Sequence, residues 1–425
     1  MTCDLRSCDR RTLAEGLWRR LQPARWPVPP EAFPAGTSLV GGAVRDGLLD
    51  RLAERPDLDL VVAEEAIPLC KRLARRHRGS CVVLDEPRSI ARLVVADWTI
   101  DVARLAGPDL ESDLARRDYS VNAIALPLPT GDAAPTLVDP QGGLADLEAA
   151  QLRAIAEANL LDDPLRLLRG LRLAAELGFA LEPRTADWIR RHADRCGTVA
   201  GERVLAELER LAAVLHGGER WLAEAVSLGL LAPWGAAPPA PAALAELDGD
   251  APRRRGLEPT EAAWALPLAR LGSLLDGQAL VALRASRRLQ QRTARLRSGW
   301  AVVAAAIAVG DAPLAGLPEE TRLTLQRQLE ADLPAWLLGL PVEVAADALE
   351  RWRDAADPLF HPRPPLDGRT LQAALDLEAG PELGRLIDHL TRERAFGRLA
   401  TEDPSGAQSL ACARRWLMER DGRCD

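Results

Sequence analysis

The chain has 425 residues, 27% of them charged, and a formal net charge of −8 at pH 7. At roughly 100 to 200 residues per domain, this length predicts two to four domains. No apolar run approaches the length of a membrane span, which excludes a membrane protein, and the N-terminal residues lack the apolar segment of a secretion signal. We therefore expect a cytoplasmic globular protein.

Basic and sulfur-containing residues give little independent evidence of function. The seven cysteines are odd in number and have no Cys-x-x-Cys spacing, so we interpret them as free thiols. A negative net charge is not typical of nucleic-acid-binding proteins, and any RNA surface must be a local patch. Two basic clusters, at 71–78 and 284–297, are by themselves most simply interpreted as solvated helix faces.

The segment from Leu39 to Val62 is the most informative part of the chain. A short apolar strand runs into Gly41 and Gly42, where missing side chains let backbone N–H groups approach an anionic ligand. Arg45 can clamp a phosphate, and the residues from 44 to 52 favour a helix. This arrangement predicts a triphosphate cradle.

A pair of carboxylates follows at the start of a second strand. Period two places Asp57 and Asp59 on the same face of that strand. Two adjacent carboxylates repel each other unless a cation lies between them, and hard oxygen ligands beside a triphosphate favour Mg²⁺. An isolated Asp-x-Asp pair is weak evidence, but together with the upstream glycines it predicts a two-metal centre for in-line phosphoryl displacement.

Three further strands are predicted at 80–84, 91–95 and 97–102. Asp101 lies in the last of them and would complete a carboxylate triad if that strand pairs beside Asp57 and Asp59. Downstream, a polar cluster at 113–122 precedes an apolar stretch, a layout suited to holding a ribose and triphosphate. A turn and helix at 139–147 come next, and then Asp163, Pro164 and Arg166 open a long amphipathic helix.

The ordered set of these motifs resembles the bacterial, class II tRNA nucleotidyltransferase and poly(A) polymerase family, the family of CCA-adding enzymes. The resemblance is strong over 39–210 and looser beyond it. It rests on Gly-Gly-Ala-Val-Arg-Asp at 41–46, Asp-Leu-Asp at 57–59, Arg-Arg-Asp-Tyr-Ser-Val-Asn-Ala at 116–123, Asp-Asp-Pro-Leu-Arg at 162–166 and Gly-Glu-Arg-Val-Leu-Ala-Glu-Leu at 201–208.

The resemblance implies a role for each matched residue. It implies metal binding at the catalytic centre by three carboxylates and triphosphate binding by three further residues: Asp57, Asp59 and Asp101, and Gly41, Gly42 and Arg45. It implies two Mg²⁺ ions as cofactors, CTP and ATP as substrates, and the 3′ end and acceptor or elbow region of tRNA as partner.

The same resemblance implies two groups of residues that contact the nucleoside. Arg117, Asp118 and Asn122 match the motif that contacts the ribose and orders the pocket. Asp163 and Arg166 match a protein template that pairs with the Watson–Crick edge of the incoming base. A carboxylate acceptor beside a guanidinium donor suits the mixed edge of cytosine or adenine.

Two positions depart from the family pattern. Asp162 stands where the family has Glu, which shortens one supporting side chain. The residues from Arg104 to Asp109 replace a much longer flexible loop that helps full CCA-adding members switch from CTP to ATP. This short segment resembles the CC-adding members. Poly(A) polymerase or A-adding activity remains an alternative, and a noncatalytic RNA-binding protein of the same fold is a more remote one.

The expected fold is α+β: an N-terminal polymerase-β-like nucleotidyltransferase head with a small mixed sheet, followed by all-α neck, body and tail. The predicted divisions are an N-terminal extension (1–38), head (39–150), neck (151–232), Pro/Ala-rich linker (233–260), body (261–350) and tRNA-contacting tail (351–425). Helical periodicity is expected at 266–283, 289–307, 323–333 and 342–349. In this setting a basic patch is a candidate tRNA surface: Arg284, Arg287, Arg288 and Arg292. Sequence leaves the oligomeric state open.

Overall fold

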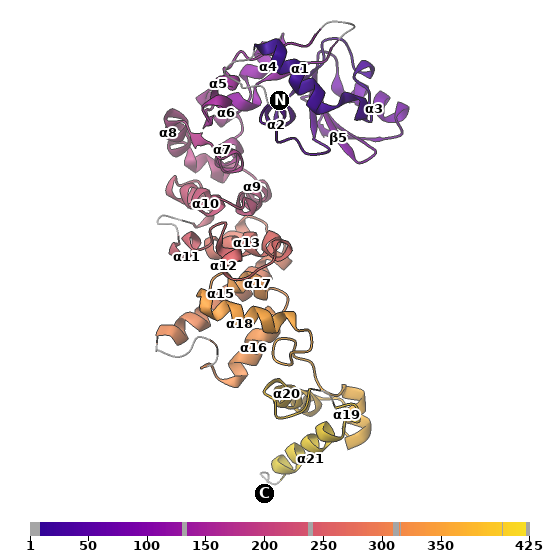
Figure 1. Cartoon of the computed structure of the whole chain (residues 1–425), viewed down its shortest axis with the longest axis vertical. Helices are drawn as coiled ribbons and strands as arrows, with labels where there is room; N and C mark the ends of the chain where they lie inside the picture. The colour runs from indigo at the N-terminus through magenta and orange to yellow at the C-terminus, as the bar shows by residue number, and fades with distance from the viewer. Residues whose placement is uncertain are drawn as a thin grey trace. The chain divides into compact units, whose positions relative to one another are not determined.

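The structure is a computed structural model that describes residues 9–129, 134–236, 241–308, 314, 316–401 and 403–421. Contacts divide the chain into two compact units. Unit 1 comprises residues 1–207 and 228–233, and unit 2 comprises 208–227 and 234–425 (Figure 1). Among the described residues, no helix is both long and apolar enough to cross a membrane.

A six-stranded mixed sheet forms the N-terminal half of unit 1, in the order β3-β4-β5-β2-β1-β6. Its strands are β1 (Ser38–Val40), β2 (Leu58–Val62), β3 (Ser80–Asp85), β4 (Ile90–Val95), β5 (Trp98–Arg104) and β6 (Ala125–Pro127). Only β2 and β5 pair in parallel, and the other neighbours are antiparallel. The three strands predicted after the carboxylate pair are confirmed within one or two residues at each end.

Helices cover both faces of this sheet. Helix α3 (Ala66–Arg76) packs against β3, β4 and β5, and α2 (Gly42–Leu48) follows β1. On the other face, Val61 of β2 packs with Leu114 of α4 (Leu110–Ala115). Helix α1 (Arg10–Leu21) packs against α2, so the described part of the predicted N-terminal extension contacts the head. The predicted helix at 44–52 is wrong at its ends, because α2 starts at Gly42 and stops at Leu48.

The rest of unit 1 is mainly helical. It contains α5 (Gly143–Glu148), α6 (Glu157–Asp162), α7 (Leu165–Leu177), α8 (Pro183–Arg191) and the first turns of α9 (Gly201–Ala213). A small parallel pair, β7 (Gln151–Leu152) and β8 (Ala180–Leu181), lies beside α7. The predicted turn and helix after Asp139 and the predicted helix after Pro164 are confirmed.

Every described element of unit 2 is helical, which agrees with the predicted α+β class. The helices are α10 (Gly218–Ser227), α11 (Ala242–Ala245), α12 (Ala251–Arg254), α13 (Pro259–Leu274), α14 (Gly277–Ala282), α15 (Arg287–Ala308), α16 (Glu319–Leu329), α17 (Leu333–Leu337), α18 (Val342–Arg353), α19 (Gly368–Leu375), α20 (Pro381–Ala395) and α21 (Ala407–Asp421). Residues 237–240 of the predicted linker lie outside the described residues, and Leu247 and Ala251 after them belong to the core of this unit.

Two predicted helices are each divided in the structure. The expected helix at 266–283 is two helices, because Asp276 caps the start of α14 by accepting a hydrogen bond from Ala279 N at 2.8 Å. The expected helix at 323–333 ends at Leu329, and α17 begins four residues later with Pro334 in its first turn. Local apolar periodicity is continuous across both breaks and so does not reveal them.

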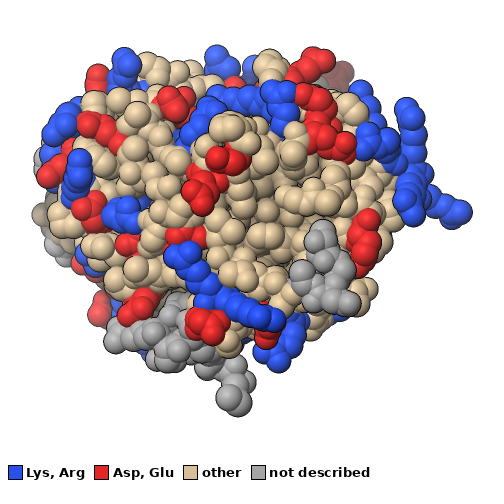
Figure 2. Space-filling model, turned by 90° about the horizontal axis from the view of Figure 1, so that it is seen from above, with Lys and Arg blue, Asp and Glu red and all other residues tan. Residues whose placement is uncertain are grey.

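Charge on the surface is mixed. Figure 2 shows basic and acidic side chains interspersed over the face seen from above, which agrees with the modest net charge of −8. A positively charged surface for RNA must therefore be sought in local groups of arginines.

Candidate active site

Two of the three predicted catalytic carboxylates lie side by side on the sheet. Strand β2 pairs in parallel with β5, and the register places Asp59 opposite Asp101. The strands are therefore adjacent, which is the condition on which the predicted carboxylate triad depends. Asp57 is exposed and precedes the first residue of β2 by one position. Because directly opposite residues of paired strands point to the same side, Asp59 and Asp101 lie on one side of the sheet, and Asp57 is near enough for its charge to act on Asp59.

The carboxylates on this side of the sheet repel one another. Burial, and then the negative charges of Asp101 and Asp57, raise the pKa of Asp59 to about 6. Arg117 and Arg92 oppose this shift. Among the residues that the structure describes, no three or more His, Cys, Asp or Glu side chains are arranged to hold a metal ion. The donor chemistry and the repulsion nevertheless fit a hard divalent ion at Asp59.

Gly41 brings the end of β1 against the catalytic carboxylate. It has a φ of +73°, and a Cβ there would lie 2.8 Å from Asp59 Oδ2. A side chain at this position would be strained and would also displace the carboxylate. Gly42 begins α2 directly after it. The two glycines therefore keep free backbone beside Asp59, where the sequence predicts the triphosphate.

Arg45, Asn122 and Asp118 form a hydrogen-bonded chain between the predicted phosphate and ribose sites. Arg45 Nη1 donates to Asn122 Oδ1 at 2.6 Å, and Asn122 Nδ2 donates to Asp118 Oδ1 at 3.3 Å. Arg45 also makes two hydrogen bonds to Asp46, at 2.8 and 2.9 Å, and its side chain is buried. Its guanidinium is thus held by protein groups in this structure.

A charged network extends from the ribose motif into the neck helices. Arg169 Nη1 lies 3.5 Å from Asp118 Oδ2, and Arg169 Nε lies 3.8 Å from Glu207 Oε1. Glu207 also accepts a hydrogen bond from Arg172 Nε at 2.5 Å. Because Glu207 and Asp118 are both buried, the guanidinium groups between them fix α7 and α9 relative to the ribose motif.

The two predicted template residues lie together at the start of α7. Asp163 Oδ2 accepts a hydrogen bond from Arg203 Nη2 of α9 at 2.9 Å. Arg166 Nη1 donates to the backbone carbonyls of Arg116 and Asn159, at 3.2 and 2.7 Å. Asp163 is thereby fixed against α9, whereas Arg166 is fixed against α6 and against the segment that carries the ribose motif.

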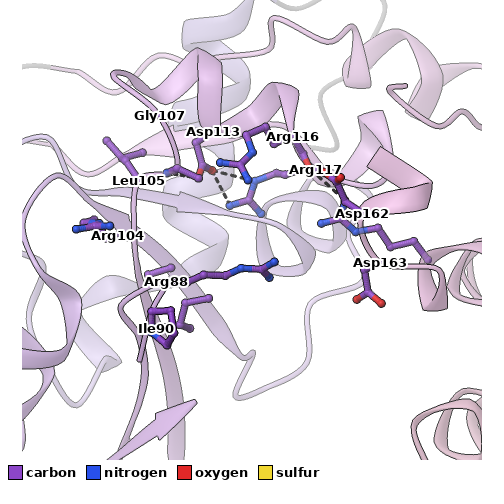
Figure 3. A pocket seen from close by; sticks show the side chains of 14 residues that line it. Arg88, Ile90, Arg104, Leu105, Gly107, Asp113, Arg116, Arg117, Asp162 and Asp163 are labelled. Atoms are coloured by element: carbon purple, nitrogen blue, oxygen red, sulfur yellow. Dashed lines mark hydrogen bonds and ion pairs between the residues drawn. The ribbon is translucent and has the colours of Figure 1, made fainter. Parts of the chain in front are cut away.

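A pocket of about 460 Å³ lies between this template and the sheet. Asp162, Asp163 and Arg166 line it on the helical side, and Ile90 with the connection from Ala103 to Gly107 lines it on the sheet side (Figure 3). Asp113 fixes this connection by accepting from Ala106 N at 3.0 Å, and it also pairs with Arg117. The pocket has the size of a small-molecule site and continues the sheet face that carries Asp101.

Comparison with known proteins gives the family. Residues 37–153 match the model "Poly A polymerase head domain" and residues 178–234 match "Probable RNA and SrmB- binding site of polymerase A". The chain is 34% identical over 404 residues to a CC-adding tRNA nucleotidyltransferase of Synechocystis sp., covering 88% of this chain and 92% of that one. The chain belongs to the tRNA nucleotidyltransferase family.

Two further proteins of this tRNA nucleotidyltransferase family show the extent of the likeness. An A-adding tRNA nucleotidyltransferase of Deinococcus radiodurans is 41% identical over 192 residues, which cover 44% of this chain and 42% of the relative. A Thermotoga maritima CCA-adding enzyme complexed with tRNA has a TM-score of 0.73 at 19% identity, covering 96% of this chain and 99% of that one, and so shares the fold. The predicted family and enzyme class are confirmed.

Four arginines near the site of this nucleotidyltransferase were not singled out from sequence. Arg88, Arg104 and Arg116 line the pocket, and Figure 3 shows Arg88 extending toward its middle. Arg92 on β4 pairs with Asp101. A usable signal exists for Arg92 alone: Val95 pairs with Trp98 across a two-residue turn, and counting back along this hairpin places Arg92 opposite Asp101.

Gly170 of α7 is required for the close approach of Tyr119. A Cβ at Gly170 would lie 2.0 Å from the Tyr119 hydroxyl, which donates to the Arg166 carbonyl at 2.7 Å. We expect Gly170→Ala to push out the buried tyrosine, lower the free energy of unfolding by about 1–3 kcal/mol and raise the KM for nucleotide. Thermal unfolding and steady-state kinetics measure both effects.

The matched control is Gly16→Ala in α1, where a Cβ meets nothing within 4 Å. This change should leave the KM unaltered and leave stability unaltered or higher by up to about 1 kcal/mol. Equal stability of the Gly170→Ala and parent proteins would contradict the steric assignment.

The predicted tRNA patch is on α15 and the residues before it in unit 2. Arg284, Arg287 and Arg288 are exposed. Arg292 is different: its Nε lies 2.7 Å from Asp332, a buried carboxylate, and its guanidinium stacks over Trp264 at 5.4 Å. One turn further along the helix, Arg295 is exposed. The exposed members of this surface are therefore Arg284, Arg287, Arg288 and Arg295, while Arg292 is engaged within its own unit.

Proposed function

We propose that this enzyme adds the two C residues of the CCA end to the 3′ end of tRNA, using CTP and no nucleic-acid template. The observation that carries the proposal is the pocket, in which Asp163 and Arg166 face a wall built by the short connection after β5. Five residues separate the end of β5 at Arg104 from the start of α4 at Leu110. The likeness to the Synechocystis CC-adding enzyme over 92% of its length supports the same assignment.

In the proposed reaction the 3′-hydroxyl oxygen of tRNA attacks the α-phosphorus of CTP in line. A new phosphodiester forms, the bond to the β-phosphate oxygen breaks, and pyrophosphate leaves. Asp57, Asp59 and Asp101 would hold two Mg²⁺ ions, which when bound supply charge neutralisation and activation of the attacking hydroxyl. The raised pKa of Asp59 and its position beside Asp101 support this role.

The chain's own groups orient the nucleotide. Gly41 and Gly42 offer backbone N–H groups beside Asp59, and Arg45 orders the ribose motif through Asn122. Asp163 accepts and Arg166 donates hydrogen bonds at the base edge. Because both side chains also bind protein groups, their positions are set before the nucleotide enters, which reduces the entropic cost of recognition.

Primer extension tests the proposal directly. A tRNA transcript ending at its discriminator base is incubated with CTP, ATP or both, and products are resolved at single-nucleotide resolution. Two additions with CTP and no third in the presence of ATP are expected. Three additions would identify a complete CCA-adding enzyme, and no addition under any condition would leave a noncatalytic RNA-binding protein.

A-addition is the second candidate function. The Deinococcus A-adding relative is 41% identical to this chain over 192 residues, and that likeness favours this candidate. Two kinds of RNA substrate, a tRNA ending in CC and a set of unrelated RNAs, separate the possibilities. Extension of the tRNA by a single nucleotide from ATP would indicate A-addition. A long A ladder on several unrelated RNAs would indicate a poly(A) polymerase.

Selection between CTP and ATP is expected to depend on Arg166. Arg166→Ala removes the guanidinium donor from the base edge, and a lost bidentate contact of this kind is worth about 1–3 kcal/mol of discrimination. We expect the CTP preference to fall about 10- to 100-fold, measured as the ratio of kcat/KM values. Arg191→Ala, which removes an exposed neck arginine paired with Glu157, should leave this ratio unchanged. Unaltered selectivity in Arg166→Ala would exclude the template role.

Binding of tRNA is expected to use the exposed arginines of α15. Reversing charge at Arg288 and Arg295 should raise the KM for tRNA about tenfold and leave that for CTP unchanged, because phosphate contacts contribute to RNA affinity alone. Arg292 is omitted because its reversal would break the buried pair with Asp332. Reversal of the exposed Arg253 is the control. Equal tRNA KM values in both variants would dismiss the patch.

A further inference from the structure

Arg92 of β4 binds the carboxylate that the proposed mechanism assigns to a metal ion. Its Nε and Nη2 donate to Asp101 Oδ1 and Oδ2 at 2.8 and 2.9 Å, a bidentate pair. The two residues are directly opposite in the antiparallel pair of β4 and β5, and Asp59 is opposite Asp101 on the other side. One row across three strands therefore reads Arg92, Asp101, Asp59.

This pair uses both oxygens of Asp101. Each oxygen keeps a second lone pair, so a divalent ion at this carboxylate would share an oxygen with the guanidinium, and the two positive charges would repel each other across it. The guanidinium and the ion therefore compete electrostatically for Asp101. The guanidinium supplies the positive charge that the repelling carboxylates require.

The pair is also easily exchanged. The Arg92 side chain is 45% exposed and that of Asp101 is 24% exposed, so water and salt screen their attraction and its contribution to fold stability is small. A buried pair such as Arg172 with Glu207, in which both side chains are nearly inaccessible, would not open in this way. An exposed arginine on a catalytic carboxylate is therefore suited to release.

We propose that Arg92 is a positioning residue. Its guanidinium binds the Asp101 carboxylate in place of a divalent cation, and it is displaced when the cation binds. This inference rests on the proposed two-metal function and adds to it that the affinity for the cation is set by competition with Arg92. In the cation-free enzyme, Arg92 holds the Asp101 carboxylate in place beside Asp59.

The test is a measurement of Mn²⁺ binding in the absence of nucleotide, in which the free ion is quantified by electron paramagnetic resonance. Arg92→Gln keeps a polar side chain without the charge and should lower the Kd for Mn²⁺ about tenfold. Arg92→Lys keeps the charge but loses the bidentate geometry, so its Kd for Mn²⁺ should lie between those of Arg92→Gln and the parent protein. The Mg²⁺ concentration for half-maximal primer extension should fall in the same order.

Two controls separate competition at Asp101 from a general charge effect. Arg72→Gln removes an exposed arginine of α3, which pairs with Glu64 before that helix. Because α3 covers the other face of the sheet, this change should leave the Kd unchanged. The double variant Arg92→Gln/Asp101→Asn should bind no more tightly than Asp101→Asn alone. Equal Kd values for Arg92→Gln and the parent, or tightening of equal size in the double variant, would overturn the inference.

Failure of the underlying metal assignment has its own signature. Asp101→Asn should weaken Mn²⁺ binding at least tenfold, and an unchanged Kd in that variant would remove Asp101 from the metal site and with it the basis of the proposed mechanism. If Arg92→Gln does not fold, as judged by circular dichroism, the Arg92→Lys value decides: a Kd equal to that of the parent protein would overturn the competition.

Discussion

Arg270→Met is expected to lower the free energy of unfolding of unit 2 by about 3–5 kcal/mol, the cost of leaving buried partners unsatisfied. Arg270 of α13 has no solvent-accessible surface. Its guanidinium donates to four backbone carbonyls and one carboxylate: those of Leu247, Ala212, Val214 and Leu215, and Glu219. Burial lowers its pKa to about 10, so it remains charged at neutral pH and needs all of these acceptors.

Denaturant unfolding together with hydrogen exchange of the residues from 208 to 219 measures the effect in the right part of the chain. Arg270→Lys should also destabilise the unit, because an ammonium has three donors where the guanidinium has five. Arg254→Met, which removes an arginine paired with Asp248 near the surface, should cost about 1 kcal/mol or less. A similar loss in Arg270→Met and Arg254→Met would contradict the structural role given to Arg270.

The parts of the site that lie on regular strands are the parts that could be predicted from sequence. The strands that carry Asp59 and Asp101 could be predicted because alternation and short turns are local signals. Their adjacency was only a condition of the predicted triad, and the structure meets it because β2 and β5 pair with these two residues in register. The turn at Gly41 and Gly42 could likewise be predicted, because two consecutive glycines precede a predicted helix. Its close approach to Asp59 Oδ2 follows from that placement.

Partners that are distant in sequence could not be predicted. Phosphate binding by Arg45 stays a prediction, but the contact of its guanidinium with Asn122, 77 positions away, could not be predicted. Arg292 was expected in a patch that binds tRNA, but Asp332, the residue directly before α17, binds its guanidinium. A guanidinium carries the same local pattern whether it meets RNA or a buried carboxylate, so only the fold distinguishes these cases.

The predicted helix boundaries were wrong for a related reason. The break between α13 and α14 depends on a single capping contact by Asp276. An aspartate among periodically spaced apolar residues is equally common on the solvated face of a continuous helix, so the sequence does not reveal the break. By contrast, the α+β class and the position of the pocket follow from motif order, which tolerates errors of a few residues at each boundary.

Asp59→Asn is expected to abolish nucleotide addition, by about 1,000-fold or more, and at the same time to stabilise the cation-free protein at neutral pH. The folded-state pKa of Asp59 is raised to about 6 from an ordinary value of 3.8. A carboxyl whose pKa is raised on folding lowers stability as the pH rises from 3.8 to 6, and above 6 the penalty is constant at about 3 kcal/mol. Asparagine keeps the shape and removes this penalty.

The pH dependence separates this account from a simple packing change. Melting temperatures of Asp59→Asn and the parent protein should nearly agree at pH 3, which is below both pKa values, so that the carboxyl is largely neutral in both states; the variant should melt higher at pH 7.5. Added Mg²⁺ should stabilise the parent more than the variant, because a bound cation offsets the same repulsion from Asp101. A variant that melts lower at pH 7.5 would mean that Asp59 is stabilised by its neighbours, and the case for a cation site at this row of carboxylates would then fall.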